Sequence, residues 1–296
     1  MTLAFDRKFD PPYGVAEKVS PLVTRVVCAN PGPFTFTGTA TFLIGDRELA
    51  VIDPGPDDDA HLEALLAAID KRPVSHIIVT HTHRDHSPLA ARLKALTSAA
   101  TAGYGPHAGG TVAGLKLDAA GDDSFTPDLR LAHGDVISGP DFTIEAVHTP
   151  GHTSNHLSFA LREEQALFCG DHVMAWSTTV VAPPDGDMGQ YLQSLELLLG
   201  RPDRIYWPTH GPPRVDPHPL VRGLIAHRRM REGAILARLR QGALRIDELV
   251  AAIYADVDPK LHGAAALSTL AHLALLIAAG RVVEVGGSGG PLYRLA

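Results

Sequence analysis

The stretch HIIVTHTHRDH, residues 76–86, decides how the rest of the chain is interpreted. Its first half is a short apolar run of the kind that fills a buried β-strand. Within the next six residues the chain places four side chains that can bind a metal: His81, His83, Asp85 and His86. Imidazole and carboxylate groups are good ligands for zinc and related divalent metals. A loop that leaves a buried strand can present several side chains to one cavity, so the stretch predicts a metal site rather than a solvated histidine loop.

Further ligands must come from other loops, because one loop cannot complete two metal positions. Three candidates lie beside a glycine at the end of an expected strand: His152 in PGHT, Asp171 in CGDH and His210 in THGP. Glycine beside a ligand lets the backbone approach the ion closely. The chain holds 16 histidines but only two cysteines, which excludes a disulfide framework and a cysteine cage for zinc.

The hydrophobic pattern predicts a layered α/β fold followed by a smaller helical unit. Strands are expected at residues 23–30, 40–45, 48–55, 76–81, 141–149, 156–161, 165–171 and 204–210, and helices at 61–69, 88–96 and 188–199. After Gly211-Pro212-Pro213 three helices are expected, at 219–241, 245–255 and 264–280, before two short strands. This last part has the outline of a winged helix. The predicted domains are residues 1–214 and 215–296.

The order HTHRDH, PGHT, GD and a late TH resembles the metallo-β-lactamase superfamily over about residues 20–212. The resemblance implies an αββα sandwich with two divalent metals at one edge of the sheets. Zinc is the expected metal, and manganese or iron would suit the same ligands. The resemblance also implies that Asp53 braces the HTHRDH loop. It assigns His81, His83 and His152 to the first metal, Asp85, His86 and His210 to the second, and Asp171 to both.

Three longer stretches resemble the β-lactamase-like endoribonuclease family, which has a C-terminal winged helix: NPGPFTFTGTATFLIG (30–45), GDHV with TTVV, and AHRRMREGAIL (226–236). That family usually has Asn where Ala40 stands. The resemblance predicts a hydrolase that cleaves single-stranded RNA, with a hydroxide shared by the two metals as nucleophile. Asp85 would both bind metal and orient that hydroxide.

Two other functions fit the same motifs. The first is a thioester or ester hydrolase of the glyoxalase II type, acting on a small metabolite. It shares HTHxDH and a bridging Asp. The second is a metal-responsive nucleic-acid binder without catalysis. Asp171, as a bridging carboxylate, favours catalysis over that reading, because such a ligand set leaves open positions for water.

Charge is distributed unevenly along the chain, whose net charge is −7. Residues 1–214 hold 16 basic and 26 acidic residues, a net −10, which does not favour RNA binding. Residues 215–296 have a net +3, with arginines concentrated between Arg222 and Arg245. These arginines predict either a surface for an anionic substrate or a solvated helix face. Within them, His227 and Arg228 are candidates to meet a substrate phosphate.

Two further histidines flank the predicted ligands. His156 and His172 are interpreted either as hydrogen-bond partners of the ligands or as ordinary strand residues. No signal peptide or membrane-length apolar run is present, so the cytoplasm is the expected compartment and no membrane partner is predicted. The sequence does not set the oligomeric state and leaves a homodimer open.

Overall fold

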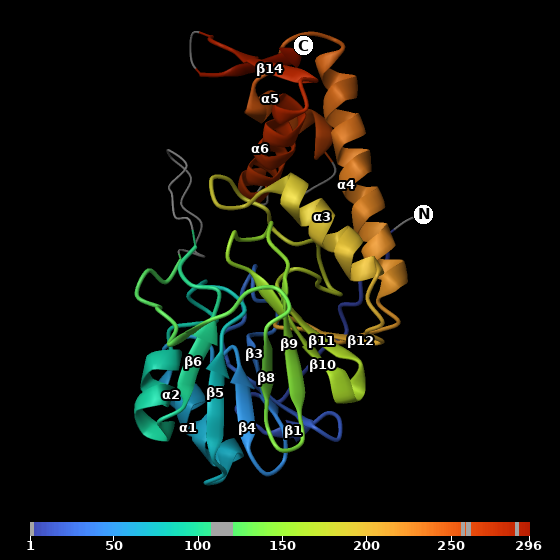
Figure 1. Cartoon of the computed structure of the whole chain (residues 1–296). Helices are drawn as coiled ribbons and strands as arrows, with labels where there is room; N and C mark the ends of the chain where they lie inside the picture. Colours follow the sequence, from blue (N-terminus) through green and yellow to red (C-terminus); the bar gives the residue numbers. More distant parts are fainter. Residues whose placement is uncertain (1–2, 108–120, 256–257, 259–261, 288–289) are drawn as a thin grey trace.

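Two β-sheets packed face to face form the body of the molecule (Figure 1). The computed structural model describes residues 3–107, 121–255, 258, 262–287 and 290–296. Helices cover the outer face of each sheet, and a helical unit carries the C-terminus (Figure 1). The predicted αββα sandwich with a C-terminal winged-helix-like unit is confirmed.

The first sheet changes from antiparallel to parallel pairing along its width. Its strands follow chain order: β1 (Glu17–Lys18), β2 (Val23–Val27), β3 (Ala40–Ile44), β4 (Leu49–Ile52), β5 (Val74–Ile78), β6 (Ala100–Gly103) and β7 (Leu129–Arg130). Pairing is antiparallel from β1 to β4 and parallel from β4 to β7. The parallel strands are joined through α1 (Asp59–Ile69) and α2 (Ala90–Thr97), which lie on the outer face. Asp58 caps α1 by accepting a hydrogen bond from the His61 backbone N–H at 2.7 Å.

The second sheet runs in nearly the reverse order of the chain. Its order is β13 (Arg214–Val215), β12 (Ile205–Pro208), β11 (Ala166–Gly170), β10 (Leu157–Leu161), β9 (Thr143–His148) and β8 (Val136–Ser138). A short 3₁₀ helix, η1 (Arg162–Glu164), joins β10 to β11. Only β11 and β12 pair in parallel, and α3 (Met188–Leu199) connects them on the outer face. Aromatic side chains fill the space between the two sheets: Phe42, Phe142, Phe159, Phe168 and Trp207.

Helix α4 (His218–Leu239) belongs to two hydrophobic cores. Its first half, including Leu220 and Leu224, packs with α3 over the second sheet. Its second half, including Ile235 and Leu239, packs with α5 (Ile246–Ile253), α6 (His262–Ala278) and the hairpin of β14 (Val282–Val285) and β15 (Leu292–Leu295). Since one helix serves both cores, the division at residue 214 stays a prediction.

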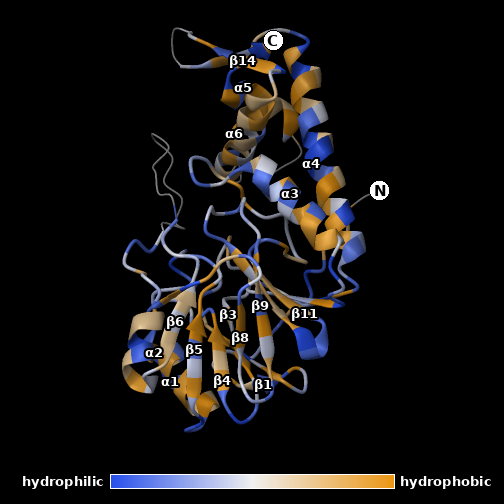
Figure 2. Ribbon diagram, viewed as in Figure 1, coloured by the Kyte–Doolittle hydropathy of each residue, from blue (hydrophilic) through white to orange (hydrophobic). Residues whose placement is uncertain are grey.

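Hydrophobic residues run along the strands of the sandwich (Figure 2). Within each sheet the parallel strands bring their carboxyl ends to one edge, and the loops that follow β4, β5, β11 and β12 therefore meet there. These loops carry the predicted ligands. None of the helices in the described part of the chain is long and apolar enough to cross a membrane.

Candidate metal centre

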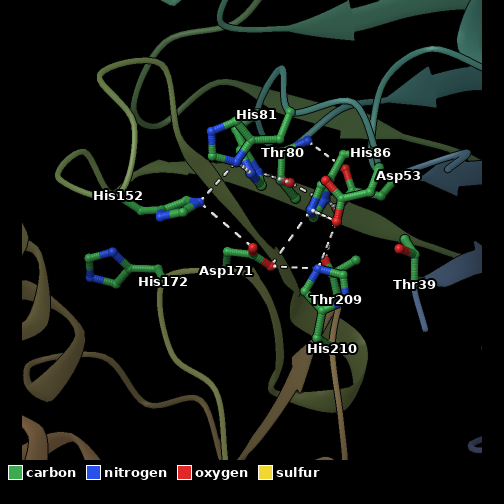
Figure 3. A network of polar contacts seen from close by, with 12 residues as sticks. Thr39, Asp53, Thr80, His81, His86, His152, Asp171, His172, Thr209 and His210 are labelled. Atoms are coloured by element: carbon green, nitrogen blue, oxygen red, sulfur yellow. Dashed lines mark hydrogen bonds and ion pairs between the residues drawn. The ribbon is translucent and has the colours of Figure 1, made fainter. Parts of the chain in front are cut away.

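The seven predicted ligands converge on one point at this edge (Figure 3). The loop after β5 supplies four of them, and the loops after β9, β11 and β12 supply one each. Their ligand atoms form two groups within which all separations are below 4.8 Å. The first group is His81, His83, His152 and Asp171, and the second is Asp85, His86 and His210.

Distances in the first group match the edges of a coordination tetrahedron. His83 Nδ1 lies 2.9 Å from His81 Nε2 and 3.1 Å from His152 Nε2. His152 Nε2 lies 3.7 Å from Asp171 Oδ2. A tetrahedral ion with bonds of about 2.0–2.1 Å holds its ligand atoms about 3.3 Å apart. The residues present therefore fit a zinc-like divalent ion.

The second group is built around the other oxygen of Asp171. Asp85 Oδ2 lies 3.0 Å from His210 Nε2 and 3.4 Å from His86 Nε2. Asp171 Oδ1 lies 3.4 Å and 3.7 Å from the same two nitrogens. Within the described residues, His86 Nε2 and Asp171 Oδ1 are buried without a hydrogen-bond partner. Buried polar atoms are rarely left so, and a cation would satisfy both.

Three of the imidazoles are oriented by acceptors behind them. His152 Nδ1 donates to the Val180 carbonyl at 2.6 Å, and His210 Nδ1 donates to the Gly38 carbonyl at 3.1 Å. His86 Nδ1 donates to Asp53 Oδ2 at 2.9 Å. A neutral imidazole that donates through Nδ1 keeps its lone pair on Nε2. All three lone pairs therefore point to the centre, as in known metal sites.

Asp53 connects the ends of three strands. Its side chain is fully buried, and its backbone has φ 50° at the end of β4. Oδ1 accepts the Thr80 backbone N–H at 2.8 Å, and Oδ2 accepts the hydroxyls of Thr80 and Thr209 at 2.8 and 2.9 Å as well as His86. The structure thus places Asp53 behind the HTHRDH loop. Thr80 and Thr209 were not singled out from the sequence, although each directly precedes a predicted ligand.

Protonation in the centre suits metal binding. Burial, followed by the neighbouring His152, lowers the pKa of His83 to about 3, and burial with three adjacent histidines lowers the pKa of His81 well below its usual value. Burial alone would raise the pKa of Asp85, but His86 and His210 hold it well below its usual range. Neutral imidazoles and ionised carboxylates are the forms that bind metals.

The carboxylates also concentrate negative charge around His86. Burial alone would lower the pKa of His86, yet Asp85 and Asp53 together raise it well above its usual value. The pocket therefore attracts positive charge at the position where the second group of ligands meets. A divalent cation placed there would meet the same demand.

The two flanking histidines have different environments. His156 is buried between β9 and Asp171: its Nδ1 contacts the Thr149 hydroxyl at 2.9 Å, and its Nε2 accepts the Asp171 backbone N–H at 3.2 Å. Gly170 makes this approach possible, since it has φ +50° and a Cβ there would lie 2.5 Å from His156 Nε2. His172 is buried beside the Tyr191 ring, with both ring nitrogens unpartnered among the described residues, and no dashed line reaches it in Figure 3.

Arg228 is not at the surface, which corrects the interpretation that it contacts substrate phosphate. It is 3% exposed, and its guanidinium donates to the Thr179 carbonyl and, at 3.1 Å, to the Ser268 hydroxyl. His227 is half-buried, and burial followed by Arg228 lowers its pKa to about 4. A neutral histidine and an interior arginine are poor contacts for phosphate.

Other arginines of this region also bind within the chain. Arg229 pairs with Glu196 at 3.0 Å, Arg231 donates to the Ile253 carbonyl at 3.3 Å and Arg238 donates to the Ala252 carbonyl at 3.2 Å. The positive charge along α4 is thus largely used to pack α4 against α3 and α5. This packing explains the arginine run without an anionic ligand.

Two features beside His210 were not expected from the sequence. Phe36 and Trp176 stack with ring centroids 4.7 Å apart, and a Cβ at Gly211 would lie 2.6 Å from the Trp176 ring. Ala40, where the resemblance led us to expect Asn, begins β3 and donates its backbone N–H to the Thr209 carbonyl at 2.9 Å. Neither position carried a pattern in the sequence that pointed to the centre.

Comparison with known proteins agrees with this geometry. Residues 34–210 match the model of the metallo-beta-lactamase superfamily, and residues 246–290 match the beta-lactamase associated winged helix domain. A protein of Aspergillus chevalieri named atrochrysone carboxyl ACP thioesterase is 30% identical over 292 residues, covering 95% of this chain and 88% of its own. A lactamase-like protein of Aspergillus niger is 30% identical over 268 residues, covering 84% and 78%.

A solved structure shares the fold over nearly the whole chain. It is a beta-lactamase domain protein from Burkholderia ambifaria, with a TM-score of 0.83 and 24% identity, covering 98% of this chain and 96% of its own. This likeness extends through the C-terminal helices as well as the sandwich. The names of the two curated relatives refer to thioesterases and lactamases rather than to endoribonucleases.

Proposed function

The chain belongs to the metallo-beta-lactamase superfamily, and on that premise we propose that it is a binuclear metal-dependent hydrolase of acyl thioesters. The observation that carries the proposal is the shared carboxylate: Asp171 turns one oxygen to each of two groups of ligands. The thioester class rests on the relative that aligns with 95% of this chain and is named an ACP thioesterase. A thioester on a carrier protein or on a small thiol is therefore the proposed substrate.

The reaction needs a water, a polarised carbonyl and a proton acceptor. A pair of divalent cations would supply a water of lowered pKa and polarise the thioester carbonyl. The water oxygen bonds to the acyl carbon, the C–S bond breaks and the thiol leaves, so that a carboxylic acid and a thiol form. Asp85 is the proposed residue that orients the water and receives its proton, because its side chain is 22% exposed whereas that of Asp171 is 11% exposed.

RNA cleavage, the function first expected from the sequence, has less support. The catalytic part of the chain carries a net −10, and the arginines of α4 that would meet phosphates make contacts within the chain. Phosphate binding by a protein depends on unpaired cationic side chains at the surface. The thioester proposal needs no such surface.

A substrate panel on one preparation tests the proposal. Purified protein loaded in turn with zinc, manganese or iron is assayed with acetyl and benzoyl thioesters of N-acetylcysteamine, with an acylated carrier protein and with end-labelled single-stranded RNA. We expect thiol release from at least one thioester, reduced about a thousandfold in His83→Ala because a ligand of the first group is lost. RNA cleavage that His83→Ala abolishes, without thioester turnover, would contradict the proposal.

A further inference from the structure

Arg228 is an unusual buried cation. It lies on α4 at 3% exposure, and among the described residues no carboxylate lies within ion-pair distance of it. Its partners are neutral: the Thr179 carbonyl, the Ser268 hydroxyl at 3.1 Å and the ring of Tyr191, 5.2 Å from the guanidinium carbon. Burying a charge without a counter-charge is costly. Such a residue is retained where its hydrogen bonds perform a task.

The first of these partners stands directly behind the metal centre. The Thr179 hydroxyl donates to the carbonyls of Asp171 and His172, at 2.7 and 3.0 Å. The next residue, Val180, provides the carbonyl that accepts His152 Nδ1–H. The segment Thr179–Val180 therefore contacts two proposed ligands, and Arg228 binds this segment at the Thr179 carbonyl.

The second route runs through Tyr191 on α3. Its hydroxyl donates to the His172 carbonyl at 3.1 Å, and its backbone lies against Gly151, where a Cβ would be 2.3 Å from Tyr191 Cα. Gly151 directly precedes His152. Arg228 stacks over this tyrosine and also bonds to Ser268 on α6. The guanidinium thus joins α6 of the C-terminal unit to both segments that hold His152.

We propose that Arg228 is a positioning residue of the metal centre, which fixes His152 and Asp171 through Thr179–Val180 and couples them to α6. Arginine suits this role because its planar fork donates in several fixed directions at once. A lysine has one compact ammonium group and reaches fewer of these partners. The inference rests on the proposed metal centre, and it predicts that a change on α6 alters the ligand geometry at a distance.

Cobalt binding tests the role without relying on catalysis. The full-length metal-free protein and its variants are titrated with Co²⁺ against a chromophoric chelator, and the visible absorption of the cobalt protein reports ligand geometry. We expect Arg228→Met to weaken cobalt binding about 10- to 100-fold, the usual effect of removing a residue that orients a ligand. Arg228→Lys and Ser268→Ala should weaken it less and shift the same absorption bands. Arg229→Met, on the same helix and at the surface, should bind as the wild type does.

A purely structural role would give a different result. In that case Arg228→Met would lower the melting temperature of the metal-free protein, while cobalt affinity and spectrum stayed within twofold of the wild type, and the proposal would be overturned. If Arg228→Met does not fold, Arg228→Lys and Ser268→Ala decide the matter by the same criterion. A wild-type protein that binds no cobalt would overturn the metal centre itself, and the role of Arg228 with it.

Discussion

Replacing Asp171 by Asn is expected to lower kcat/KM for thioester hydrolysis about a thousandfold, equivalent to about 4 kcal/mol. Asp171 turns Oδ2 to His152 and Oδ1 to His86 and His210. Asparagine has nearly the same shape, but it offers one neutral oxygen and one NH₂ group, which is not a metal ligand. One group of ligands therefore loses its anionic member, and the ion pair can no longer share a carboxylate. The measurement is steady-state hydrolysis together with bound metal per chain.

Asp187→Asn provides the matched control for this substitution. Asp187 caps α3 by accepting the Gln190 backbone N–H at 2.8 Å, and asparagine is an equally good cap. This variant should keep the wild-type activity and metal content. Full activity of Asp171→Asn with two metals bound would contradict the bridging role.

Replacing Asp53 by Ala is expected to destabilise the metal-free protein by about 4 kcal/mol. The substitution leaves four donors in a dry interior without their acceptor: Thr80 N–H, the hydroxyls of Thr80 and Thr209, and His86 Nδ1–H. Each buried donor left unsatisfied costs about 1–3 kcal/mol, and partial rearrangement reduces the total. Urea unfolding of the metal-free protein measures the effect separately from metal binding.

Two companion variants show whether the loss comes from these hydrogen bonds. Asp53→Asn keeps one acceptor oxygen and tolerates the positive φ of this position, so it should be destabilised less than Asp53→Ala. Asp10→Ala, at an exposed position, should leave the unfolding midpoint unchanged. Equal midpoints for Asp53→Ala and the wild type would show that the network contributes nothing.

Much of the fold follows from local pattern, and the failures have a common cause. The helix expected at residues 188–199 has the same bounds in the structure as α3, and the strands that carry apolar runs lie within two or three residues of their expected places. Strands β1, β7, β8 and β13 were not predicted, because two or three residues are too short to show a period. Their pairing depends on the strand beside them.

The candidate centre divides in the same way. Side chains that bind metal are visible in a sequence because their chemistry is unusual, and the structure brings all seven together. The Val180 and Gly38 carbonyls were not predictable, since any residue supplies a carbonyl and only the fold decides where it points. Arg228 was misplaced for a related reason: along an arginine-rich helix, packing against α3 and α6 decides which arginine is buried.

The central claim is that seven side chains hold two ions on either side of Asp171. Crystals of the zinc-loaded protein, with diffraction recorded on both sides of the zinc absorption edge, test it most directly. The account predicts two anomalous peaks about 3.5–4 Å apart, one among His81, His83 and His152 and the other among Asp85, His86 and His210. A single peak, peaks elsewhere on the surface, or none at this edge of the sheets would contradict it.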